Sequence, residues 1–114
     1  MRILNTTQNK IIVDKVVVAD SFLSRMIGLL NHKTLPSTEA LLITHCQSIH
    51  MFFMRFPIDA IFVGKNNKVV GLVYNIKPFQ LSPIFFKASF VIEVAVGVIS
   101  KSKTALGDTL AFEN

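Results

Sequence analysis

The chain has 114 residues, of which 51% are hydrophobic and 17% charged, and its formal net charge at pH 7 is +5. A chain of this length can bury roughly two-thirds of the surface that it exposes when unfolded, so we expect one domain over residues 1–114. Such hydrophobicity excludes a disordered segment. The basic residues are spread singly along the chain. This spacing argues against a nucleic-acid partner and favours a role in keeping the protein soluble.

Three features bear on the cellular setting. The one cysteine, Cys46, excludes an intramolecular disulfide. The first ten residues contain no apolar signal core. The longest charge-free run, residues 40–54, is too short for a membrane span and contains polar residues. We therefore expect a cytoplasmic monomer without a membrane span.

Strands dominate the predicted secondary structure. Residues 11–18 are dense in β-branched side chains and predict a first strand. After an N-cap at Asp20 or Ser21, residues 22–30 place apolar side chains on one broad stripe, which predicts a helix with Arg25 at the stripe's edge. The remaining predicted elements are strands at 41–44, 58–63, 69–74, 90–96 and 109–112, a hairpin turn at 65–68, and a short helix or turn at 98–106.

The order of these elements predicts the fold class. Strands that follow one another without intervening helices favour an antiparallel sheet. We predict a mainly β fold, an antiparallel sandwich or barrel-like sheet. One N-terminal helix packs on this sheet, and residues 98–106 form either a second short helix or a turn.

Polar residues inside apolar strands are the first candidates for a site. Asp59 and Glu93 have apolar neighbours on both sides, and an unpaired charge buried at either position would cost several kcal/mol. Arg25, Arg55 and His50 are the available partners. Either these groups form a buried ion-pair network, in which Arg25 pairs with at least one carboxylate and pins the helix to the sheet, or they converge on a pocket for a polar ligand.

The segment 46–54 allows further hypotheses. If it is extended, Cys46, Ser48 and His50 point to one face, which would place a cysteine nucleophile beside a histidine base. Cysteine, histidine and methionine would also suit a soft metal such as copper(I). One cysteine with one histidine lacks the paired ligand spacing of a zinc site, and we predict no metal site. Met51 to Met54 should be core, with an aromatic binding surface as the alternative.

A second hydrophobic segment lies around Pro78 and Pro83. The prolines predict irregular backbone. The segment nevertheless holds more apolar bulk than a loop needs, in Phe79, Leu81, Ile84, Phe85 and Phe86. If these side chains are exposed, they form an apolar patch that would meet a protein partner.

Three motifs carry a family resemblance. They are an arginine followed by Gly-Leu in the first helix, a central Cys-x-Ser-x-His block that continues to Met-Arg-Phe-x-Ile-Asp, and a later Glu-x-x-x-Gly. Here they are matched by Arg25 with Gly28 and Leu29, by residues 46–59, and by Glu93 with Gly97. Over roughly residues 16–112 the chain resembles the domain-of-unknown-function family numbered 192, also called uncharacterised protein family 0127. Met51 stands where a threonine is frequent.

The resemblance implies a small, mostly β domain, sandwich- or barrel-like, with one or two helices, and it supplies no function. Its polar positions coincide with the candidates already chosen. The predicted ligand-binding residues are Arg25, Cys46, His50, Arg55, Asp59 and Glu93. We predict a small-molecule or peptide binding domain with a polar pocket at the helix–sheet junction. The alternatives are a thiol-dependent hydrolase or transferase using Cys46 and His50, and a structural or protein-interaction module without a ligand.

Overall fold

The computed structural model describes residues 1–20, 35–52 and 54–114. Most of the described secondary structure is strand, with one short α-helix and one 3-10 turn. In chain order the elements are β1 (Arg2–Asn5), β2 (Lys10–Val13), β3 (Lys15–Ala19), β4 (Glu39–Thr44), β5 (Ile58–Gly64), η1 (Lys65–Asn67), β6 (Val69–Ile76), β7 (Ala88–Val94), α2 (Val98–Ser102) and β8 (Leu110–Glu113).

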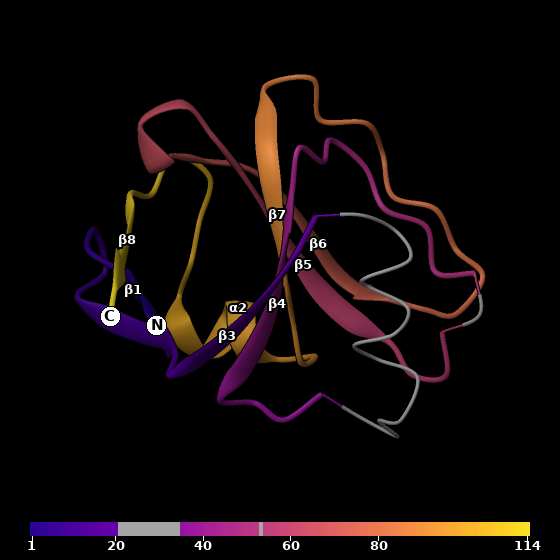
Figure 1. Ribbon diagram of the computed structural model, residues 1–114, viewed down its shortest axis with the longest axis horizontal. Helices are drawn as coiled ribbons and strands as arrows, with labels where there is room; N and C mark the ends of the chain where they lie inside the picture. Colours follow the sequence, from indigo (N-terminus) through magenta and orange to yellow (C-terminus); the bar gives the residue numbers. More distant parts are fainter. Residues whose placement is uncertain (21–34, 53) are drawn as a thin grey trace.

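The strands form two sheets (Figure 1). The smaller has the order β2-β1-β8 and the larger the order β3-β4-β7-β5-β6. Neighbouring strands are antiparallel except β3 and β4, which are parallel. Both sheets are open in the described part of the chain. The predicted mainly β class is confirmed, whereas the barrel-like form and a wholly antiparallel sheet are wrong. A parallel pair requires a long crossover between its strands, and the composition of a strand does not reveal its direction.

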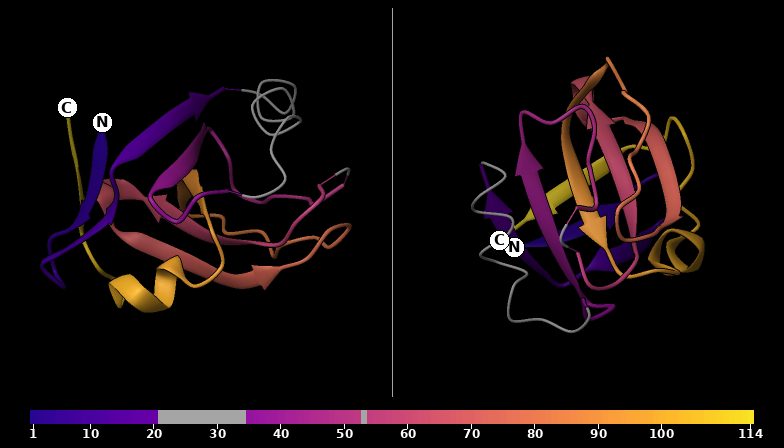
Figure 2. Two further views of the ribbon diagram at one scale, coloured as in Figure 1. Left: turned by 90° about the horizontal axis from the view of Figure 1, so that it is seen from below. Right: turned by 90° about the vertical axis from the view of Figure 1, so that its right-hand side faces the viewer.

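The central strands of the larger sheet are buried on both faces. One face carries Ile61 and Ile92, which pack against the smaller sheet at Ile3 and against α2 at Ile99. The opposite face belongs to a second core. Figure 2 shows the smaller sheet on one side of the larger one, with the two termini side by side. Burial on both faces explains the nearly continuous apolar runs of β4, β5 and β7.

We call this second core the outer core. It joins side chains of the larger sheet to side chains of the segment that follows β4. Its members are Ala19, Leu35, Leu41, Ile43, Ile49, Met51, Met54, Phe56, Ile58, Ala60, Phe62, Ile76, Ala88 and Val91. The prediction that residues 51–54 are core is confirmed for Met51 and Met54 and is wrong for Phe52, which is 41% exposed, whereas residue 53 lies outside the described residues.

The predicted strand 11–18 is two strands in different sheets. Asp14 separates β2 from β3 and forms a corner between the sheets. The Thr38 carbonyl oxygen accepts the N–H groups of Asp14 (2.9 Å) and Lys15 (3.2 Å), which fixes this corner. Sequence analysis predicted one strand because β-branched residues surround the single aspartate.

Most other predicted elements are confirmed. Strands occur at all five remaining predicted positions, and a turn follows β5, with Asn66 and Asn67 at positive φ. The second short helix exists but ends at Ser102, since Lys103 adopts a left-handed conformation. Strand β1 was not predicted. The predicted helix at 22–30 lies outside the described residues. Among those described, no helix combines the length and hydrophobicity needed to cross a membrane.

Candidate functional site

Asp59 is a structural residue in this fold. Its carboxylate is buried on β5. Oδ1 accepts the Asn75 N–H at 2.8 Å, and Oδ2 accepts the N–H groups of Gly97 at 3.0 Å and Ile99 at 3.4 Å. Hydrogen bonds from backbone N–H groups compensate a buried carboxylate for the loss of water. The side chain therefore joins β5 to β6 and to the start of α2.

The two predicted carboxylates do not come together. Across β5 and β7, Asp59 is paired with Val94 and Ala60 with Glu93. Residues directly opposite each other point to the same face of a sheet, and successive residues alternate. Asp59 therefore faces the smaller sheet, whereas Glu93 faces the outer core, where it is fully buried. One pocket cannot gather both carboxylates.

The thiol of Cys46 is engaged as a hydrogen-bond donor. Cys46 is half-buried against the outer core, and its Sγ donates to the Ser48 carbonyl oxygen at 3.0 Å. A thiolate has no proton to donate, so this contact favours the protonated thiol, whereas nucleophilic attack requires the thiolate. Residues 46–49 also form no strand, because the chain bends at Gln47. The predicted extended alignment of Cys46, Ser48 and His50 is therefore wrong.

The remaining predicted residues are distributed over different surroundings. His50 is half-buried, and its ring centroid lies 4.9 Å from that of Phe52. Arg55 is exposed to solvent. Arg25 lies outside the described residues, so a pocket at the predicted helix–sheet junction stays a prediction. Within residues 1–20, 35–52 and 54–114, no three His, Cys, Asp or Glu side chains gather in a way that could hold a metal ion.

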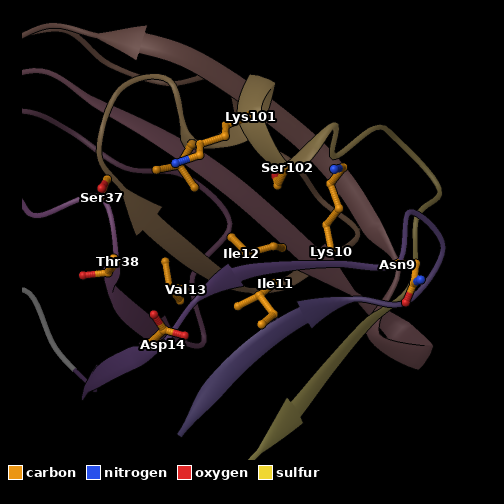
Figure 3. A pocket seen from close by; sticks show the side chains of 11 residues that line it. Asn9, Lys10, Ile11, Ile12, Val13, Asp14, Ser37, Thr38, Lys101 and Ser102 are labelled. Atoms are coloured by element: carbon orange, nitrogen blue, oxygen red, sulfur yellow. The ribbon is translucent and has the colours of Figure 1, made fainter.

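Two clefts lie away from these residues. One, of about 540 Å³, is bordered by β2, the turn at 37–38 and α2. Figure 3 shows Lys10 rising over it from β2, with Ser37 and Thr38 across from it on the neighbouring turn. A second, of about 570 Å³, lies between β6 and residues 104–106. None of the five predicted site residues in the described part of the chain lines either cleft.

Sequence analysis missed one buried polar cluster. Asn5 donates through Nδ2 to the Thr104 hydroxyl at 3.1 Å and to the Asp108 carboxylate at 2.9 Å. Asp108 also accepts the Ala105 N–H at 2.9 Å. These bonds tie β1 to the loop before β8. The only sequence signal was an asparagine at the end of an apolar run, which also describes an ordinary turn.

An exposed apolar surface lies between β6 and β7. Residues 77–87 run beside residues 46–52 in both views of the ribbon (Figures 1 and 2). Four large apolar side chains of this segment are 57 to 78% exposed. We call them the apolar ridge: Phe79, Leu81, Ile84 and Phe86. Phe52, also exposed, lies on the neighbouring segment, where His50 is bridged to Leu81.

Phe85 anchors the apolar ridge to the larger sheet. Its ring centroid lies 4.4 Å from that of Phe62 on β5. It also covers Gly71 on β6, where an added Cβ would lie 2.4 Å from two of its ring carbons. Phe62 and Gly71 are cross-strand partners, so both present the same face to the ring. The absence of a side chain at Gly71 is therefore what admits Phe85.

Backbone hydrogen bonds hold the rest of the segment in place. Met51 accepts the Phe79 N–H at 2.8 Å and donates to the Gln80 carbonyl at 2.8 Å. Further along, Ser82 N–H donates to the Ile49 carbonyl (2.9 Å) and Phe85 N–H to the Gln47 carbonyl (2.7 Å). The four ridge side chains therefore project from a backbone fixed at several points. The condition set for an apolar patch, exposure of the side chains, is met by these four residues, whereas Phe85 is half-buried.

These features define a small β domain of two open sheets with an ordered, exposed apolar ridge. The chain belongs to the DUF192 family, described as Uncharacterized ACR, whose model matches residues 3–112. It is similar to a UPF0127 protein of Thermococcus sibiricus, with 34% identity over 97% of this chain and 74% of the relative. A UPF0127 protein of Pyrococcus furiosus is 32% identical over 94% of both chains. The fold is similar to the crystal structure of a protein of unknown function from Novosphingobium aromaticivorans, with a TM-score of 0.79 and 19% identity over 97% of this chain and 82% of that one.

Proposed function

We propose that this protein is a polypeptide-binding module whose contact surface is the apolar ridge together with Phe52. The observation that carries the proposal is the 57 to 78% exposure of four large apolar side chains on a hydrogen-bonded backbone. Fully burying a side chain of this kind is worth about 1.5–3 kcal/mol. Because the backbone is already ordered, a partner would meet a surface that needs little rearrangement.

The predicted site residues support binding over thiol chemistry. The Cys46 thiol donates a hydrogen bond to a carbonyl oxygen, and the Asp59 carboxylate accepts N–H groups of β6 and of the start of α2. Asp59 and Glu93 lie on opposite faces of the larger sheet. His50 lies beside Phe52 and Leu81, at the border of the proposed contact surface.

Open backbone donors favour a polypeptide as the ligand. The N–H groups of Leu81, Ile84 and Phe86 donate no hydrogen bond within the described part of the chain. A partner chain can offer carbonyl oxygens to such donors while its side chains contact the ridge, as in strand addition. In a lipid phase the same N–H groups would lack acceptors, at a cost of several kcal/mol.

Selection from a random dodecapeptide library on the immobilised protein tests the proposal. Selected peptides should bind with Kd values in the micromolar range, and replacing Phe79 and Phe86 by serine should weaken binding at least tenfold, ~1.4 kcal/mol. Val17→Ser, which removes an apolar side chain that is 51% exposed on β3, is the matched control and should bind like the parent. Equal binding to the parent and to the Phe79→Ser, Phe86→Ser variant would place the contact surface elsewhere.

A further inference from the structure

The stretch of sequence that contains the apolar ridge is basic. Between Ala40 and Ile92 the basic residues are Arg55, Lys65, Lys68, Lys77 and Lys87, and the only carboxylate is that of Asp59. Asp59 is buried and accepts three backbone N–H groups. The segment that carries the ridge, residues 77–87, therefore presents two lysines to solvent and holds no carboxylate.

Two lysines bracket the ridge. Lys77 precedes Pro78 and Lys87 follows Phe86, and both are exposed. Within residues 1–20, 35–52 and 54–114, neither ammonium takes part in an ion pair or hydrogen bond. Lys68 and Lys15 differ from them, because Lys68 donates to the Thr109 hydroxyl at 2.7 Å and Lys15 lies 3.5 Å from Glu39. Lys77 and Lys87 are thus available to a partner.

On the basis of the function proposed above, we propose that the partner is an extended apolar polypeptide segment with acidic residues at both ends. The apolar side chains of the segment would cover the ridge, and its carbonyl oxygens would accept the open N–H groups of Leu81, Ile84 and Phe86. Its terminal carboxylates would pair with Lys77 and Lys87. A fully extended strand spans about 3.3 Å per residue, so a segment of roughly ten residues or fewer covers the distance between the two lysines.

Charges at the two ends of the contact surface would act on selectivity. Complementary charges at the rim of an interface raise the rate of association and fix the register, and they do so less at high salt. An apolar segment with basic ends would meet two like charges and be disfavoured. The lysines would therefore select among apolar segments that the ridge alone would accept equally.

Three synthetic peptides with one core of alternating leucine, threonine and valine test this inference by fluorescence anisotropy. The ends of the first peptide carry aspartate and glutamate, those of the second carry glutamine, and those of the third carry lysine. The acidic peptide should bind the parent at least tenfold more tightly than the glutamine peptide, and the ratio should shrink as salt rises. The double variant Lys77→Gln, Lys87→Gln should lose this preference. The control Lys101→Gln, Lys103→Gln, which removes the same charge from exposed positions at α2, should keep it.

The outcomes separate this inference from the proposed function. Equal binding of the acidic and glutamine peptides would overturn the inference and leave polypeptide binding standing. Failure of all three peptides and of the library selection would overturn both. Sedimentation with phosphatidylserine–phosphatidylcholine vesicles is a further arm. If the parent binds these vesicles through the ridge and no peptide binds, an anionic lipid surface replaces the polypeptide.

Discussion

Replacing Gly71 by alanine should destabilise the protein by displacing Phe85. The new Cβ would lie 2.4 Å from two carbons of the Phe85 ring and 2.7 Å from a third, closer than the 3.0 Å limit that real Cβ contacts respect. The ring cannot move toward the sheet, because it already packs against the tilted ring of Phe62. Overpacking of this kind typically costs about 1–3 kcal/mol. Peptide binding should weaken as well, since Phe85 anchors the apolar ridge.

A double-mutant cycle isolates the contact. Phe85→Ala alone should cost less than the about 3–5 kcal/mol of a fully buried phenylalanine, because the ring is half-buried. In that background the methyl group of Gly71→Ala meets no ring. It should then be neutral or stabilise by about 0.4–1 kcal/mol, since alanine restricts the unfolded chain. Urea unfolding of the four proteins would give a coupling of about 1–3 kcal/mol. The same cost for Gly71→Ala in both backgrounds would refute the argument.

Three further predictions concern buried charge. Asp59→Ala should lower the free energy of unfolding, measured with urea, by about 3 kcal/mol or more, because backbone N–H groups lose their acceptor. Asp59→Asn should lower it less, since asparagine keeps one acceptor oxygen. Equal losses for the two variants would contradict this explanation. Burial raises the pKa of Asp108, but hydrogen bonds, chiefly from Asn5, outweigh it and lower the pKa below its ordinary value of 3.8. The unfolded state therefore takes up the proton first, so this stabilisation is complete above about pH 4 and is lost as the pH falls through the folded-state value. The free energy of unfolding of Asp108→Asn should depend less on pH in this acid range than that of the parent. The same pH dependence in both proteins would argue against a stabilising role of the Asp108 carboxylate. Arg25→Met should cost about 3–5 kcal/mol if Arg25 pairs with Glu93, and adding Glu93→Leu should recover much of the loss; a single variant that melts like the parent would exclude the pair.

The central strands β4, β5 and β7 of the larger sheet were predictable because they are buried on both faces. Such strands are continuous apolar runs bounded by turn residues, as residues 58–63 are before the turn at 65–68. Strand β1 was not predictable, because four residues with two buried side chains are too few to show an alternation of apolar and polar residues. The break at Asp14 was also hidden, because one residue ends a strand only if a neighbouring segment such as Thr38 fixes the corner.

The candidate site was predicted less well than the fold. Burial of Asp59 and Glu93 follows from their apolar neighbours, and both are buried. Which face each occupies depends on the register between β5 and β7, and a shift of one residue reverses the face. The exposed apolar segment was recognisable from its bulk. The inward position of Phe85 was not, because it depends on Gly71, which is distant in sequence.

The pairing of β1 with β8 has a consequence for folding kinetics. Arg2 and Glu113, which are joined by a 2.6 Å ion pair, are separated by 111 positions in the sequence. Closing so long a loop in an unfolded chain carries a large entropic cost. This cost falls once the hairpin of β5 and β6 has formed and paired with β7, because the effective loop is then shorter. The smaller sheet should therefore assemble after the main folding barrier. Mutations at Ile3 or Leu110 should then accelerate unfolding while leaving the folding rate nearly unchanged.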